Sequence, residues 1–229
     1  MRDVLRRLRG AGRPDLLLGG TLLLALGLRL VGLTWDQGGF FHPDERSIYM
    51  RVLELGWPRS VGEVLDAARS PLNPRWFPLG SVLLYTLLLI RTALAPVVAM
   101  GLEELALAGR TLSVLGDTAG VLLLYLLGAR LYGRRVGLLA AALLALAPIA
   151  IQTSHFYRPE PFLVAFTLAV FLFLHRWMQG GRPRDAALLG VFLALSFAVK
   201  LSVAPILLPV ALGFAYRLVA PRGRAEVPS

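Results

Sequence analysis

The 229-residue sequence has no cysteine and few charged residues. Without cysteine the chain forms no disulfide, and cysteine-ligated zinc sites and thiol catalysis are excluded as well. Charged residues make up 17% of the chain and hydrophobic residues 56%, a balance that a water-soluble domain of this size seldom has. These two absences indicate an integral membrane protein whose apolar side chains face lipid.

Acidic residues are the scarcer charged groups, with 14 Asp and Glu against 24 Lys and Arg, and the formal net charge is +10. The positive charge gathers in short clusters at the borders of apolar runs, where it orients helices in a membrane. Aromatic and basic residues do not interleave as platforms for stacking bases would require. We therefore expect membrane lipids as partners and no nucleic acid.

Six apolar runs predict an all-α, polytopic transmembrane bundle with about six crossings. The runs comprise residues 16–34, 112–127, 136–154, 161–177, 186–199 and 203–214. The first run is longer than the roughly 7 to 15 residues of a signal-peptide core, and no small-residue cleavage site follows it. We therefore expect a retained helix there.

A further apolar run, residues 79–100, carries Arg91 at its centre and Pro96 near its end. An arginine at mid-bilayer costs a few kcal/mol, so we expect this run to lie in the membrane interface, strongly tilted from the other helices. A full crossing with a snorkelling Arg91 is the alternative.

The basic clusters predict which side of the membrane each loop faces, because short loops rich in Arg and Lys stay in the cytoplasm. Besides the first fifteen residues, the clusters are Arg130, Arg134 and Arg135; Arg176, Arg182 and Arg184; and Arg217, Arg222 and Arg224. We expect both termini in the cytoplasm and residues 35–78 as the first extracytoplasmic loop. The whole chain, residues 1–229, is expected to form one membrane domain in the inner or plasma membrane.

The polar loop of residues 35–78 is expected to contain short interfacial helices. Within it, Ile48, Val52 and Leu55 recur at helical spacing, which is typical of a helix lying on the bilayer surface. Several prolines break the rest of this loop.

Acidic residues of two predicted outer loops are the candidate catalytic groups. Asp44 and Glu45 belong to the tetrad HPDE, and Glu160 to the stretch HFYRPEP. A carboxylate within hydrogen-bond reach of a hydroxyl can take its proton as the hydroxyl attacks. The alternative is that each acid is simply solvated, as exposed acids usually are.

Cationic side chains near these acids are the candidate substrate-binding groups. Lys200, Arg158 or Arg75 can hold a departing phosphate, a division of labour typical of a transferase. His42 and His155 complete the set, but neither HxxxH nor HxH spacing supports a metal site. This pattern requires no cofactor, and binding of a divalent cation is left as an open alternative.

Two further ionisable residues, Arg29 and Asp117, lie inside apolar helices. Buried charges usually pair, so we expect a structural ion pair here rather than a catalytic role. Asp117 belongs to the stretch GDTAG, whose small residues let helices approach closely.

An ordered series of stretches resembles a known family of enzymes. The stretches are FHPDER (residues 41–46), SPLNP (70–74), residues 109–148, QTSHFYRPEPFLVAF (152–166) and LALSFAVKLSVAPILLP (193–209). Their order is similar to that of the GT-C integral membrane glycosyltransferases that use a polyprenyl-phosphate sugar donor. That group includes protein O-mannosyltransferases and the aminoarabinose transferase of lipid A.

The resemblance implies an inverting transfer from a lipid-linked sugar donor to a lipid, protein or glycan acceptor. Asp44 would be the general base for the acceptor, with Glu45 beside it. The family usually carries Asp where this chain has Glu160, and some members carry a phosphate-contacting Lys where this chain has Arg75.

Family members typically continue through further helices, so this chain resembles their amino-terminal half, and activity of the chain alone is an open expectation.

Two other functions compete with the enzyme. One is a non-catalytic scaffold or partner subunit of the same fold, which retention of Asp44 and Glu45 disfavours. The other is a transporter, for which broken helices and an inverted repeat would be expected and are not evident.

Overall fold

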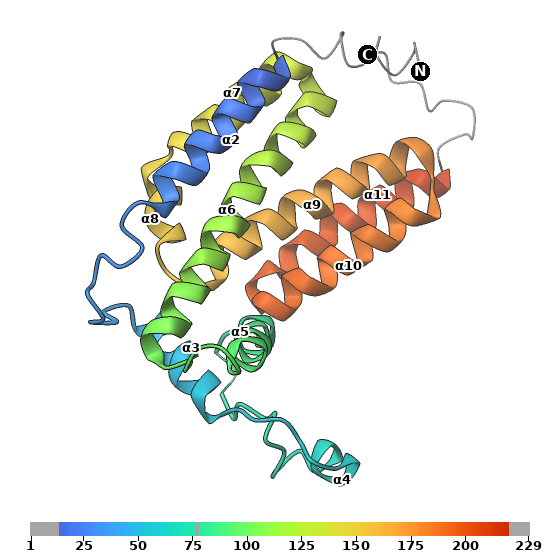
Figure 1. The fold of residues 1–229 in the computed structure, drawn as a ribbon. Coiled ribbons are helices and arrows are strands. Elements are labelled where there is room, and N and C mark those ends of the chain that lie inside the picture. Colours follow the sequence, from blue (N-terminus) through green and yellow to red (C-terminus); the bar gives the residue numbers. More distant parts are fainter. Residues whose placement is uncertain (1–13, 77, 220–229) are drawn as a thin grey trace, which may run out of the picture.

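The computed structural model describes residues 14–76 and 78–219, and within these ranges every regular element is a helix (Figure 1). The protein is therefore an all-α membrane protein, as predicted. The elements are α2 (Pro14–Leu30), α3 (Pro43–Glu54), α4 (Val61–Leu65), α5 (Ser81–Leu94), α6 (Leu102–Tyr132), α7 (Arg134–Leu146), α8 (Pro148–Ser154), α9 (Pro159–Gly180), α10 (Pro183–Val199), the 3₁₀ helix η1 (Leu201–Ile206) and α11 (Leu207–Val219).

Among the described residues, three helical stretches are long and apolar enough to cross a membrane: Leu102–Tyr132, Pro159–Gly180 and Leu201–Val219. Helices α7 and α8 form a fourth if the pair, bent by 59°, is one span. Helix α2, apolar over Leu16–Leu30, and α10, with 17 residues, are shorter. Helices thus occupy all the predicted runs, but helix length and composition support up to four crossings rather than about six.

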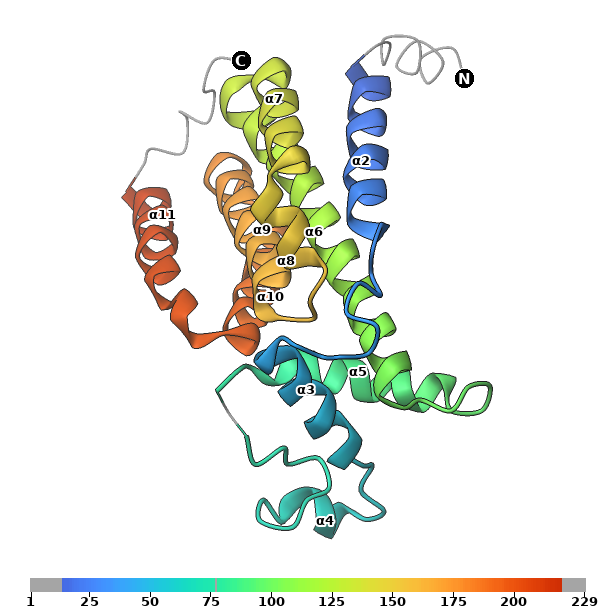
Figure 2. The ribbon, with the colours of Figure 1, turned by 90° about the vertical axis from the view of Figure 1, so that its left-hand side faces the viewer.

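The bundle has two distinct ends (Figures 1 and 2). The start of α2, the α6–α7 turn, the α9–α10 turn and the end of α11 lie at one end, which we call the basic end because it carries Arg130, Arg134 and Arg182. Helices α3, α4 and α5 lie at the opposite end, the loop end. The basic clusters thus share one end, while their members in residues 1–13 and 220–229 lie outside the described chain.

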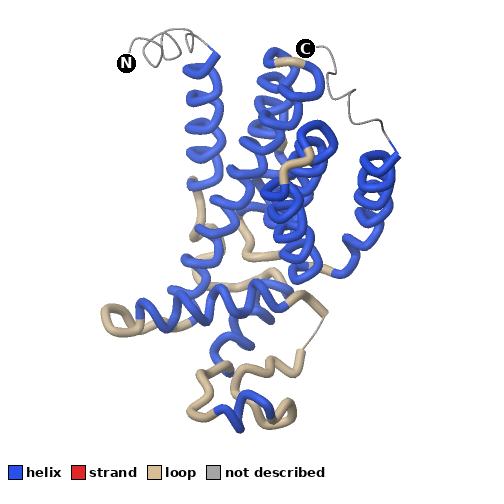
Figure 3. Tube along the Cα trace, turned by 90° about the vertical axis from the view of Figure 1, so that its right-hand side faces the viewer, coloured by secondary structure: helices blue, strands red, loops and turns tan. Residues whose placement is uncertain are grey.

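Helix α5 runs across the bundle rather than along it, which confirms the predicted tilt (Figures 2 and 3). Arg91 explains why this orientation is stable. Its Nη1 donates to the carbonyl oxygens of Val52, Leu53 and Leu55 at 2.9, 3.3 and 3.3 Å, at the carboxyl end of α3. A cation at this end of a helix satisfies free carbonyls and complements the helix dipole.

Helix α3 forms where the spacing of Ile48, Val52 and Leu55 predicted a helix. These three side chains are buried, and they belong to a core cluster with Leu84 and Leu87 of α5. The apolar face of α3 therefore packs on protein.

An ion pair between Arg29 and Asp117 joins α2 to α6 in the bundle interior, as predicted. Arg29 also donates to the carbonyl oxygens of Leu144 and Ala145, at 3.1 and 2.9 Å. These carbonyls lie at the break between α7 and α8, where Pro148 has no N–H to donate. The charge of Arg29 is therefore neutralised and its donors are used inside the bundle.

Close packing of α6 on α9 depends on the small residues of GDTAG. A Cβ on Gly116 would lie 3.2 Å from the ring of Phe162, tighter than most real contacts. A Cβ on Gly120 would lie 3.8 Å from Val164, at ordinary contact distance. Gly116 thus lets the two helices approach closely, as small residues do in membrane bundles.

Candidate functional site

Arg110 of α6 is the centre of a buried ionic network at the loop end. Its Nη1 and Nη2 donate to the two carboxylate oxygens of Asp36 at 2.8 and 2.7 Å, and its Nε and Nη2 donate to those of Glu45 at 2.8 and 2.8 Å. Nη1 also donates to the carbonyl oxygen of Leu33 at 2.7 Å. All five N–H donors of the guanidinium therefore have an acceptor.

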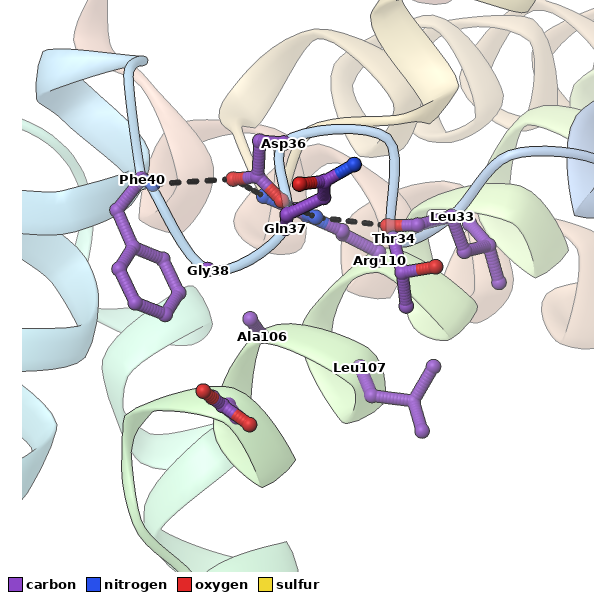
Figure 4. A pocket seen from close by; sticks show the side chains of 10 residues that line it. Leu33, Thr34, Asp36, Gln37, Gly38, Phe40, Ala106, Leu107 and Arg110 are labelled. Atoms are coloured by element: carbon purple, nitrogen blue, oxygen red, sulfur yellow. Dashed lines mark hydrogen bonds and ion pairs between the residues drawn. The ribbon is translucent and has the colours of Figure 1, made fainter.

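A cavity of about 290 Å³ lies between residues 33–40 and α6, next to this network (Figure 4). Gln37, Gly38 and Phe40 have φ values of 49°, 83° and 45°, so the chain turns tightly there. Within the turn, Asp36 accepts a hydrogen bond from the backbone N–H of Phe40 at 3.0 Å. The hydrogen bonds from Arg110 lower the pKa of Asp36, which keeps this carboxyl ionised beside the guanidinium.

Glu45 is fully buried and connects three parts of the chain. Besides the bonds from Arg110, its Oε1 accepts from the hydroxyl of Tyr49 at 2.8 Å and from the backbone N–H of Tyr157 at 3.0 Å. Burial and the nearby carboxylate raise the pKa of Tyr49, so this phenol stays a hydrogen-bond donor. Each oxygen of Glu45 thus accepts at least one hydrogen bond from the protein, and because the residue is fully buried an acceptor hydroxyl cannot reach it.

A second group of charges, which we call the charged cluster, comprises His42, Arg158, Glu160 and Lys200. Arg158 contacts His42 through Nη1 and Nε2 at 3.1 Å, and its Nε lies 2.6 Å from Glu160 Oε2. Lys200 Nζ lies 3.2 Å from Glu160 Oε1. All of these side chains are partly exposed. Glu160 therefore bridges two cations at a place that solvent or a ligand can reach.

The charged cluster forms because three chain segments change direction at one place. His42 and Arg158 are the N-cap residues of α3 and α9, and a proline follows each at the first helical position. Lys200 ends α10 in an extended conformation, with φ −162° and ψ 125°. Gly80 fixes that end of α10, because its N–H donates to Val199 at 2.9 Å and an added Cβ would collide with the Ala198 carbonyl.

Asp44 lies in the first turn of α3, two residues after His42. Its side chain is half-buried and makes no hydrogen bond or ion pair with any residue in the described part of the chain. The neighbouring acids Asp44 and Glu45 therefore differ sharply in environment: the first carboxylate is free and the second is saturated.

Two other predicted residues lie outside the charged cluster. The ring nitrogens of His155 lie 2.8 and 2.7 Å from the carbonyl oxygens of Ile151 and Val31, so this histidine ties α8 to the end of α2. Arg75 is exposed and its Nη2 donates to the carbonyl of Ala68 at 2.7 Å, within its own loop. The structure does not bring Arg75 to the other candidates.

His155 also lines a cavity of about 360 Å³ with Trp35 and Phe156. The ring centroid of Phe156 lies 5.5 Å from that of Trp35 and 4.9 Å from that of His42. An aromatic surface thus leads from this cavity to the charged cluster. Over residues 14–76 and 78–219, no group of three or more His, Asp or Glu residues is placed to hold a metal ion.

Sequence reasoning missed Arg110 and Asp36, which organise the site. A signal for Arg110 was present, because an arginine inside a long apolar helix requires a partner. The same argument identifies Arg29 and Asp117 as a pair. Nothing in the sequence indicated which acids of the loop Arg110 would bind.

Comparison with known proteins identifies a family. A family model described as dolichyl-phosphate-mannose-protein mannosyltransferase matches residues 82–227, well over half of the chain. The match includes Arg158, Glu160 and Lys200 but begins after His42 and Asp44. No curated protein and no solved structure matches the chain. The chain belongs to the dolichyl-phosphate-mannose-protein mannosyltransferase family and is a membrane glycosyltransferase.

Proposed function

We propose that the loop end transfers a glycosyl group from a polyprenyl-phosphate-linked sugar to an acceptor hydroxyl on the extracytoplasmic side of the cell membrane. The family description supports a lipid-linked sugar as donor and a protein or glycan as acceptor. One observation carries the assignment of the site. Glu160 holds Arg158 and Lys200 together beside His42, the N-cap of the helix whose first turn carries the free carboxylate of Asp44.

Asp44 acts as the general base. It takes the proton of the acceptor hydroxyl while the hydroxyl oxygen attacks the anomeric carbon of the donor. The bond between that carbon and the phosphate oxygen breaks, and its electron pair stays on the phosphate. A single displacement of this kind inverts the configuration of the sugar. Glu45 acts through Arg110, because its own oxygens are occupied, and it positions the first turn of α3.

Arg158 and Lys200 stabilise the departing lipid phosphate. They bring two positive charges against the single negative charge of Glu160, which leaves a net attraction for an anion. Fixed charges of this type are most effective where negative charge develops in the transition state. Glu160 holds both cations in place before the donor binds. Arg75 is the weaker candidate for this role, since it is held within its own loop.

The proposal is tested by transfer from a polyprenyl-phosphate mannose in membrane vesicles that contain the protein at its natural length. Asp44→Asn should lower turnover about a hundredfold or more with donor binding kept. Lys200→Gln should weaken donor binding as well as turnover, because it contacts the phosphate before and after the reaction. Glu54→Gln, an exposed acid of the same helix, is the control. Unchanged transfer by Asp44→Asn, or a product with retained configuration, would contradict the mechanism.

The proposed sidedness places the basic end in the cytoplasm and the loop end outside. Arg110 and Arg130 are twenty residues apart on α6, which is about 30 Å at 1.5 Å per residue. That distance matches the thickness of the hydrocarbon core, about 30 Å, and supports an interface near each residue. Since the chain has no cysteine, Arg134→Cys and Arg46→Cys provide single labelling sites. An impermeant thiol reagent added outside should label position 46 and leave position 134 unlabelled; the reverse result would overturn the arrangement.

A further inference from the structure

A cavity of about 250 Å³ lies at the basic end, where α6 and α9 finish and α10 begins. Its lining residues are Arg130, Arg176, Gln179, Gly180, Arg182 and Asp185. The cavity is at the opposite end of the bundle from the charged cluster, so it takes no part in the glycosyl-transfer site (Figure 1).

Positive charge exceeds negative charge in this cavity. Arg176 Nε lies 2.8 Å from Asp185 Oδ1, and Asp185 is only 2% exposed, so this pair neutralises itself. Arg130 and Arg182 make no side-chain hydrogen bond or ion pair with any residue of the described chain. Two guanidinium groups therefore face one cavity without a counter-charge from the described residues.

The amino end of α10 adds to this positive potential, whereas the carboxyl ends of α6 and α9 oppose it with partial negative charge. Gly181 ends α9 in the left-handed conformation, with φ 61°, which lets α10 begin at once. Arg182 is the N-cap of α10 and its side chain caps no backbone N–H. The amino end of a helix carries partial positive charge and unsatisfied N–H groups, both of which favour an anion.

We propose that this cavity binds a phosphate group, supplied by the headgroup of an anionic phospholipid in the leaflet at the basic end. The planar fork of arginine matches phosphate oxygens and can donate two hydrogen bonds at once. Basic pockets between transmembrane helices bind phosphorylated lipid headgroups for this reason. The cavity is smaller than the about 300 to 1,000 Å³ of pockets for drug-sized ligands, and a single headgroup phosphate suits it.

The test is an equilibrium titration of the purified chain, in a neutral detergent, with short-chain phosphatidylglycerol. The double variant Arg130→Gln with Arg182→Gln should bind this lipid at least about tenfold more weakly, since two charge-assisted contacts are lost. The matched control is Arg135→Gln with Arg184→Gln, which removes two exposed arginines of the same end that do not line the cavity. The control should change the affinity for the lipid less than about twofold, because it alters only the general electrostatic field at the basic end.

Three outcomes would overturn the proposal: equal weakening in both double variants, equal binding of short-chain phosphatidylcholine, or full affinity in the Arg130→Gln with Arg182→Gln variant. A parallel titration with inorganic phosphate separates the two sources of the group. Arginine-dependent binding of inorganic phosphate, without binding of phosphatidylglycerol, would overturn the assignment to a lipid headgroup and leave a site for free phosphate. Arg130→Lys and Arg182→Lys, which keep the charge but lose the fork, should weaken binding a few-fold without loss of folding.

Discussion

Loss of charge should have different effects at the two adjacent acids Asp44 and Glu45: at Glu45 it should lower stability, and at Asp44 it should lower sugar transfer. Glu45 accepts hydrogen bonds from Arg110, from the Tyr49 hydroxyl and from the backbone N–H of Tyr157. In Glu45→Gln the amide NH₂ must face one of these donors in either orientation of the side chain. The buried guanidinium also loses one of its two counter-charges.

The magnitude follows from the burial of this pair. Removing one partner of a buried ion pair typically costs about 3 to 5 kcal/mol, because the other charge is left without compensation. Asp36 still faces Arg110, so we expect the lower part of that range, about 3 kcal/mol, for Glu45→Gln. Asp44→Asn removes no contact with a described residue, and a change within about 0.5 kcal/mol is expected.

Urea unfolding in detergent, followed by tryptophan fluorescence, measures the free energy of unfolding of both variants under the same conditions. Sugar transfer is measured on the same samples. Glu45→Gln should shift the unfolding midpoint to lower urea, whereas Asp44→Asn should keep the midpoint and lose transfer. A normal midpoint for Glu45→Gln, or an equal loss of stability in both variants, would refute the assignment of one acid to structure and the other to chemistry.

Three further predictions concern the interior, the positioning of the cluster and pH. Arg29→Met and Asp117→Asn should each destabilise the protein by a few kcal/mol, and the double variant by less than their sum in urea unfolding, because it leaves no lone charge. Gly80→Ala should reduce transfer, because the added Cβ would displace the end of α10. Gly190→Ala, on α10 itself but with open space around it, should leave transfer unchanged. Asp36 has a lowered pKa through bonds from the α6 guanidinium, so its stabilisation is complete above about pH 3.9 and lost as pH falls further. The free energy of unfolding should therefore depend less on pH below about pH 4 in Asp36→Asn than in the unchanged protein. An identical pH profile of the two would contradict this.

Local features of the sequence were sufficient to predict the helices. Apolar runs require helices in lipid, because every backbone polar group must be satisfied within the chain there. The tilt of α5 followed from Arg91, since its charge disfavours a crossing. The carbonyls of α3 that Arg91 binds could not be predicted, because they belong to a segment more than thirty residues away in sequence.

The candidate site was predicted as a set of residue types and not as a geometry. His42, Arg158, Glu160 and Lys200 were all named from the sequence, and the structure brings them together. Arg75 was named on the same grounds, yet its loop holds it elsewhere. Charge and position relative to apolar runs are local properties, whereas the meeting of two loops depends on how the helices between them pack.

The sequence alone thus determined that the chain is an all-α membrane protein, where its helices run and which charged residues are candidates for chemistry. Hydrophobicity, helix breakers and charge clusters act over short stretches and can be read from the chain directly. Only the tertiary structure separated Asp44 from Glu45, because burial and hydrogen-bond partners decide whether a carboxylate is free or saturated. Those partners come from α6 and from the segment before α9, and only helix packing brings these segments to α3.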